Sequence, residues 1–325
     1  MKRRRLLASA WLAAPCAWGA ESERRVHTVG VLQTAPLTTN ASARTMAVLR
    51  DSLRALGLVE GQNLKLVLRS AEGRPPALPA LADELVKLPV HVLCAFGPAA
   101  VQAAVAASRS VPIVALDLES DPVQAGWARN LSAPGGNVTG LFLNLPDFAG
   151  KWLELLRELL PRLQRVGAVW DATTGPAQAD AVREAARRFS LELKVHALRS
   201  TDEMPGALEA ARVGGAQALL MLSSPLTRNA SQQVAEFAAR HRLPAISPFR
   251  AFPDAGGLMS YGPDLDYFFA RTASFADKIL RGAKAGNLPI EQPARFELIV
   301  NAAVARSLGL NVPRTVLLRA NEVIE

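Results

Sequence analysis

The side chains that could do chemistry are few, and the most concentrated group of them lies at residues 117–121. This group reads DLESD, and its carboxylates Asp117, Glu119 and Asp121 could ligate a metal ion or act as acid and base. Asp121 precedes Pro122, however, where capping of the next helix accounts for it fully. We therefore expect no metal site here, whereas Asp117 could point into a ligand cleft, towards an ammonium group.

Motifs of enzymes and cofactor sites are missing from the chain. The four histidines lie far apart and form no HxxxH or HExxH pair, so no zinc site is predicted. There is no GxSxG, GxxxxGK[ST] or GxGxxG motif. We predict no enzyme and no cofactor. An α/β enzyme is kept as an alternative, with Asp117, Asp121 and Asp171 as its candidate catalytic groups.

The elements that would position such side chains follow a repeating pattern from His27 onward. Short apolar runs predict strands at 27–33, 64–70, 90–96, 111–116 and 137–143, and then at 165–171, 191–198, 216–224, 243–247 and 257–262. Amphipathic, helix-like stretches separate most of them. Apolar strands that are each followed by a helix are typical of a parallel sheet covered on both faces. The sequence therefore predicts an α/β fold with two doubly wound parallel-sheet lobes joined by a hinge.

The pattern also predicts where the lobes begin and end. We expect the chain to cross between them around 141–148 and again near 262–266. The N-terminal lobe would comprise residues 27–143 plus about 263–325, and the C-terminal lobe residues 144–262. The lobe that the final segment joins is left open by the pattern.

The first 20 residues resemble an export signal. A basic cluster from Lys2 to Arg5 precedes an apolar run and then small residues, which predicts a signal peptide at 1–20 and a periplasmic location. The net charge of +8 falls to +4 without this segment, and the other basic residues form no stripe with aromatics, so no nucleic-acid partner is expected. No later segment has about 18 uninterrupted apolar residues, so stable membrane insertion is not expected either.

Small and polar residues stand at the carboxyl ends of the predicted strands. Open α/β sheets bind ligands beyond this edge, where helix N-termini offer N–H groups to a carboxylate. Gly97 permits close approach there, and proline is favoured in a first helical turn. The predicted ligand-binding residues are Gln33, Thr34, Gly97, Pro98, Asp117, Asp171, Ser223, Ser224 and Tyr261.

Residues 247–262, SPFRAFPDAGGLMSYG, are predicted to form the rim of this cleft. Gly256 and Gly257 would turn the backbone tightly into the last strand, so that Tyr261 offers a flat ring and a hydroxyl. Arg250 has two possible roles: it either pairs with an acid or guards the cleft.

Several segments together resemble a known family. They are LVEGQNLKLVLRSAEG, LSAPGGNVTG, KWLELLRELLP, FRAFPDAGGLMSYG and LPIEQPARFELIVNAAVARSLGLNVPRTVLLRANEVIE. In order and spacing they resemble the ABC transporter substrate-binding proteins related to tryptophan and aromatic-amino-acid binders. The resemblance implies the type I periplasmic-binding-protein fold, with a ligand enclosed between two hinged lobes at the strand ends named above.

This resemblance also implies a function. The chain would capture a small ligand, an amino acid or related small carboxylate, and deliver it to an ABC transporter permease, acting as a monomer. A sensor that presents the same fold to a signalling receptor is the alternative that the sequence cannot separate from it.

Overall fold

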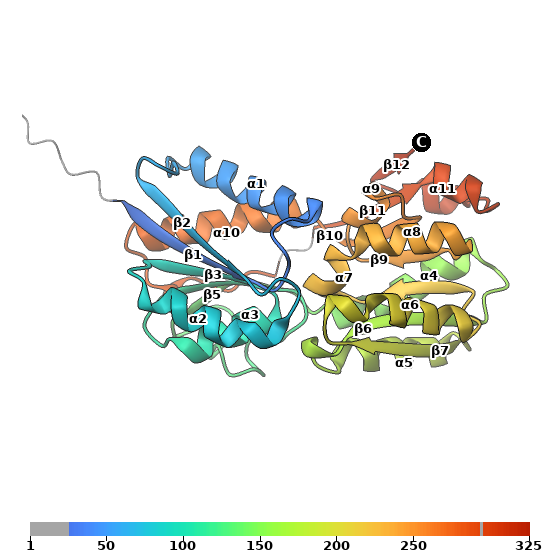
Figure 1. Cartoon of the computed structure of the whole chain (residues 1–325), viewed down its shortest axis with the longest axis horizontal. Coiled ribbons are helices and arrows are strands. Elements are labelled where there is room, and N and C mark those ends of the chain that lie inside the picture. The colour runs from blue at the N-terminus through green and yellow to red at the C-terminus, as the bar shows by residue number, and fades with distance from the viewer. Residues whose placement is uncertain (1–25, 293–294) are drawn as a thin grey trace, which may run out of the picture.

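Two sheets divide the chain into two lobes that lie side by side (Figure 1). The structure is a computed structural model and describes residues 26–292 and 295–325, so the predicted signal peptide lies outside the described residues. The first sheet has five strands in the order β2-β1-β3-β4-β5, and the second has seven in the order β12-β11-β10-β9-β8-β6-β7. All neighbouring strands are parallel except β10 and β11. The predicted fold class is confirmed.

The first lobe contains the first five strands and the helices around them. Its elements are β1 (His27–Gln33), α1 (Asn40–Ala55), β2 (Leu64–Ser70), α2 (Leu78–Lys87), β3 (Val92–Phe96), α3 (Pro98–Ala107), β4 (Ile113–Asp117), β5 (Val138–Phe142) and, from much later in the chain, α10 (Leu265–Leu280).

The second lobe contains the remaining strands and helices. Its elements are α4 (Ala149–Leu159), β6 (Arg165–Asp171), α5 (Ala177–Arg188), β7 (Glu192–Leu198), α6 (Met204–Val213), β8 (Ala218–Met221), α7 (Pro225–Asn229), α8 (Ser231–His241), β9 (Ala245–Ser247), α9 (Ala251–Asp254), β10 (Met259–Pro263), β11 (Phe296–Asn301), α11 (Ala302–Ser307), α12 (Arg314–Leu317) and β12 (Glu322–Ile324).

Helices cover both faces of each sheet, which explains the uninterrupted apolar strands. In β4, Val114 and Leu116 belong to the core cluster beneath α1 and α10, while Ile113 and Ala115 belong to the one beneath α2 and α3. Because both faces are dry, every residue of β3 and β4 is buried. Cys94 in β3 is a core residue, and burial raises the pKa of its thiol to about 12.

The segment after residue 263 divides between the lobes, which corrects the predicted boundary. α10 packs along α1 and β4 in the first lobe (Figure 1). β11 and β12 instead extend the second sheet, because β11 pairs antiparallel with β10. The prediction that about 263–325 returns as a whole to the first lobe is therefore wrong for residues 296–324. In the described part of the chain, the backbone therefore crosses between the lobes a third time. This crossing lies between Glu291, which forms a bridge to Leu141 of β5, and Phe296, which pairs with β10.

Across residues 26–292 and 295–325, no helix has both the length and the apolar character needed to span a membrane.

Candidate ligand-binding site between the lobes

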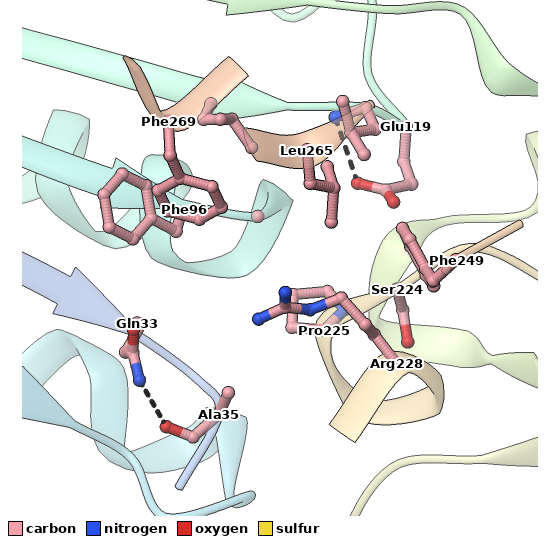
Figure 2. Close-up of a pocket in the computed structure, with 13 residues that line it drawn as sticks. Gln33, Ala35, Phe96, Glu119, Ser224, Pro225, Arg228, Phe249, Leu265 and Phe269 are labelled. Atoms are coloured by element: carbon pink, nitrogen blue, oxygen red, sulfur yellow. Dashed lines mark hydrogen bonds between the residues drawn. The ribbon is translucent and has the colours of Figure 1, made fainter. Parts of the chain in front are cut away.

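A cavity lies where the carboxyl ends of the two sheets face each other (Figure 2). It holds about 460 Å³ of empty space, part of which is open to solvent. Small-molecule sites commonly have apolar walls with a few polar groups. The lining residues come from both lobes and from α10: Gln33, Ala35, Phe96, Gly97, Leu116, Leu118, Glu119, Ser224, Pro225, Arg228, Phe249, Leu265 and Phe269.

Aromatic and aliphatic side chains form most of the wall. The rings of Phe96 and Phe269 meet edge to face, with centroids 4.8 Å apart. Phe249 approaches from the second lobe and is 3% exposed, while Leu265 lies beside them on α10 (Figure 2). Such walls favour an aromatic or apolar ligand because its burial removes apolar surface from water.

Arg228 is the cationic side chain among the lining residues. It lies on α7, which Ser224 caps by accepting a hydrogen bond from the backbone N–H of Thr227 at 3.1 Å. The side chain extends across the cavity towards the first lobe (Figure 2). Within the described residues, no group forms a hydrogen bond or ion pair with its guanidinium. Burial lowers the pKa of Arg228 to about 10, which leaves it cationic at neutral pH. A half-buried, unpaired guanidinium is suited to binding a carboxylate.

Two buried carboxyl groups lie at the first-lobe side of the cavity. Glu119 lines it, and Asp117 lies two residues earlier with 0% exposure. Asp117 accepts hydrogen bonds on Oδ1 from the backbone N–H groups of Glu119 at 2.9 Å and Ser120 at 3.1 Å. Its Oδ2 is buried without a hydrogen-bond partner in the described chain. Burial, and then the charge of Asp117, raise the pKa of Glu119 well above its usual value, and burial also raises the pKa of Asp117.

The lobes touch each other around this cavity. Ser223 Oγ of the second lobe donates a hydrogen bond to Glu119 Oε1 of the first at 2.5 Å. Thr39 Oγ1 donates to Asn229 Oδ1, also at 2.5 Å. Gly97 has φ +87°, and a Cβ there would lie 2.5 Å from Pro225 Cγ across the interface. The structure therefore shows the lobes closed on each other, and the glycine permits the close approach.

The structure brings some of the predicted site residues to the cavity and leaves others behind it. Gln33, Gly97 and Ser224 line it, and the Gln33 amide donates to the carbonyl of Ala35 at 2.8 Å. Asp117 and Ser223 are not among the lining residues, but each is hydrogen-bonded to Glu119, which lines the cavity. Contact of any of these with a ligand stays a prediction.

The other predicted residues have local structural partners. Thr34 is buried, and Pro98 occupies the first turn of α3. Asp171 accepts two hydrogen bonds from Thr173 in the turn after β6, and burial raises its pKa. None of the three is among the residues that line the cavity.

Tyr261 and Arg250 of the predicted rim lie outside the cavity lining. The Tyr261 ring packs against Phe148 and Phe296 with centroids 6.4 Å and 6.0 Å away, next to the hinge. Arg250 forms an ion pair with Glu322 at 2.7 Å and another with Asp254 at 3.3 Å, which supports the structural one of its two proposed roles.

Sequence reasoning missed the groups that face into the cavity most directly. Phe96 stands in a predicted apolar strand, Phe249 in the predicted rim and Glu119 in the acidic group at 117–121, but none of the three is among the predicted ligand-binding residues. Arg228 gave one signal: it stands four residues after a helix-capping serine at the end of a buried strand, close to the ligand-binding edge. Among the described residues, no cluster of His, Cys, Asp and Glu has a geometry that could hold a metal ion.

Comparisons with known proteins agree with this geometry. The family model of the ABC transporter substrate-binding protein matches residues 29–324. A tyrosine-binding protein of Clostridioides difficile (strain R20291) is 24% identical over 263 residues, which is 80% of this chain and 74% of that protein.

Solved structures show the same fold. A conserved domain protein of Vibrio cholerae is 26% identical with a TM-score of 0.82, covering 92% of this chain and all of that one. An ABC domain from Streptococcus pneumoniae in complex with L-Trp is 22% identical with a TM-score of 0.81, with the same coverage. A ligand-free, open substrate-binding protein from Clostridium difficile is 23% identical with a TM-score of 0.61, covering 92% of this chain and 99% of that one.

Proposed function

Since the chain belongs to the ABC transporter substrate-binding protein family, we propose that it captures an aromatic L-amino acid between its lobes and hands it to a permease. The family consists of extracytoplasmic binding proteins rather than enzymes, in agreement with the missing enzyme motifs. Two of the similar proteins are described as binding tyrosine and L-Trp, which supports the ligand class.

The observation that carries this proposal is the unpaired guanidinium of Arg228 in a cavity walled by Phe96, Phe249 and Phe269. A carboxylate would bind the guanidinium by charge-assisted hydrogen bonds. The aromatic ring of the ligand would pack among the phenylalanines. Glu119 then stands on the first-lobe side of the same cavity, where an α-ammonium group would meet a carboxyl.

Closure follows from the division of these groups between lobes. Arg228 and Phe249 belong to the second lobe, and Phe96 and Glu119 to the first. A ligand shifts an equilibrium only by its difference in affinity for the two states. An amino acid held by both lobes has its full set of contacts only in the closed form, so binding would stabilise the form that a permease recognises.

A titration with matched ligands tests the proposal. Calorimetry with L-tyrosine, L-tryptophan and L-phenylalanine should give dissociation constants of about 10 nM to 10 µM, or roughly −11 to −7 kcal/mol. Tyramine lacks the carboxylate and should bind at least about a hundredfold more weakly, a difference of about 2.7 kcal/mol. If no aromatic amino acid binds, or if tyramine binds as well as tyrosine, the proposed ligand and its orientation are wrong.

The predicted export is a separate proposal. It rests on the sequence pattern of residues 1–20, and N-terminal sequencing of protein isolated from the periplasm tests it. A mature chain that still begins at Met1 would contradict it.

A further inference from the structure

The two carboxyl groups beside the cavity have no cation within ion-pair distance. Glu119 is 5% exposed and Asp117 is 0% exposed. Within residues 26–292 and 295–325, neither forms an ion pair with a lysine, arginine or histidine. Glu119 instead accepts hydrogen bonds from the Ser223 hydroxyl at 2.5 Å and from its neighbour's backbone N–H at 3.2 Å.

The surroundings of Glu119 contain few other charges. β4 contributes Asp117, α7 contributes Arg228 at another part of the cavity lining, and the segment after β8 contributes the neutral Ser223 and Ser224. The other lining residues carry no charge: Gln33 is a neutral amide, and the rest are apolar or glycine, among them Phe249 from the second lobe and Leu265 and Phe269 from α10. Two neighbouring carboxylates that are both buried cannot both ionise at modest cost, because each charge loses its hydration and repels the other.

From this geometry we propose that the Asp117–Glu119 pair holds a proton in the ligand-free protein and releases it when the α-ammonium group of the ligand binds. The inference rests on the proposed function, because it needs a ligand with an ammonium group. On binding, the O–H bond of the carboxyl breaks, its electron pair stays on the carboxylate, and the proton passes to the buffer. The ammonium keeps its own protons and replaces that proton as the neutralising charge.

The structure also gives the direction of the effect. Burial and the Asp117 charge raise the pKa of Glu119 in the protein without ligand. A cation within about 4 Å favours the ionised carboxylate, so the pKa of Glu119 falls in the complex. Between these two pKa values, binding is accompanied by proton release, and affinity rises with pH by up to about tenfold per pH unit.

Calorimetry in buffers of different ionisation enthalpy measures the released protons directly. For wild type and L-tyrosine we expect close to one proton released per ligand at some pH between about pH 5 and about pH 8, with affinity rising across the same range. Glu119→Gln should bind more weakly, release no proton and show a flat pH profile. Circular dichroism establishes whether the Glu119→Gln variant is folded. Proton release by the wild-type protein tests the inference even if this variant does not fold. Ser223→Ala is the matched control, because it removes a hydrogen bond to Glu119 but leaves both carboxyl groups, so proton release should persist.

A ligand without the ammonium group separates this inference from the proposed function. The compound 3-(4-hydroxyphenyl)propionate keeps the ring and the carboxylate, and it should bind Arg228 without releasing a proton. L-tyrosine binding with no proton release throughout the range would overturn the inference alone. Equal release with the desamino compound, or with Glu119→Gln, would also overturn it. Failure of every aromatic amino acid to bind would overturn both the inference and the proposed ligand.

Discussion

Replacing Arg228 with methionine should abolish most ligand binding while leaving the fold intact. Methionine is unbranched and uncharged and replaces the aliphatic part of the arginine side chain, so the apolar wall of the cavity is largely preserved. Hydrogen bonds to charged groups are worth about 1.5–3 kcal/mol each. The loss of a guanidinium–carboxylate contact should therefore cost about 2–4 kcal/mol, which is about a 30- to 1,000-fold increase in Kd for L-tyrosine.

The stability of the same variant without ligand should rise or stay the same. Arg228 has no hydrogen-bond or ion-pair partner in the described chain, and its partial burial disfavours the charge. Its removal leaves no buried acid unpaired, so the melting temperature without ligand should be equal to or above that of wild type.

Calorimetry and thermal unfolding on the same preparations provide the assay, with Arg250→Met as the matched control. Arg250 also follows a strand end of the second lobe, but it pairs with Asp254 and Glu322 outside the cavity lining. We expect this control to lose some stability and to keep its affinity within about threefold, or about 0.65 kcal/mol. An Arg228→Met protein that binds L-tyrosine as tightly as wild type would refute the reasoning.

Three further variants probe the lobe contact, the acid pair and the hinge. Gly97→Ala should weaken binding by about tenfold or more, because its Cβ would meet Pro225 on closure. Backbone strain of roughly 1–3 kcal/mol at φ +87° and ψ 158° should lower the stability of the fold in addition. A Pro225→Ala second change should recover part of the lost affinity in calorimetry. Glu119→Gln should melt near the wild-type temperature at about pH 4 and above it at about pH 8. The reason is that wild type loses about 1.4 kcal/mol of stability for each pH unit between the ordinary carboxyl pKa and the raised pKa of Glu119. A difference in melting temperature that stays constant with pH in scanning calorimetry would contradict this. Tyr261→Ala should lower the free energy of unfolding by about 2–4 kcal/mol, since the ring packs against the aromatic side chains at the hinge. The Kd for L-tyrosine should change less than about threefold. A large loss of affinity in the folded variant would place Tyr261 in the site.

The fold was predictable because both sheets are buried on both faces. Runs such as VLCAF at 92–96 and IVALD at 113–117 have no polar alternation, and this pattern indicates a parallel sheet. The pattern could not assign FELIVN at 296–301 to a lobe. An apolar run fits either sheet, and its antiparallel pairing with β10 is decided by tertiary contacts.

The candidate site was predictable as a region rather than as a set of contacts. Strand ends located the edge, and Gln33, Gly97 and Ser224 do line the cavity. Side-chain direction was not readable from the sequence. Asp171 accepts a hydrogen bond from Thr173 in the turn that follows its own strand. Arg228 has the sequence position of a solvent-facing charge on a short helix, but its side chain extends into the cavity.

A crystal structure of the protein grown with L-tyrosine tests the central claim most directly. We predict one molecule between the lobes, with its carboxylate about 2.7–3.2 Å from the Arg228 guanidinium, its ring among Phe96, Phe249 and Phe269, and its ammonium facing Glu119. Tyrosine bound on one lobe alone, or bound in the cavity with its carboxylate away from Arg228, would contradict this claim.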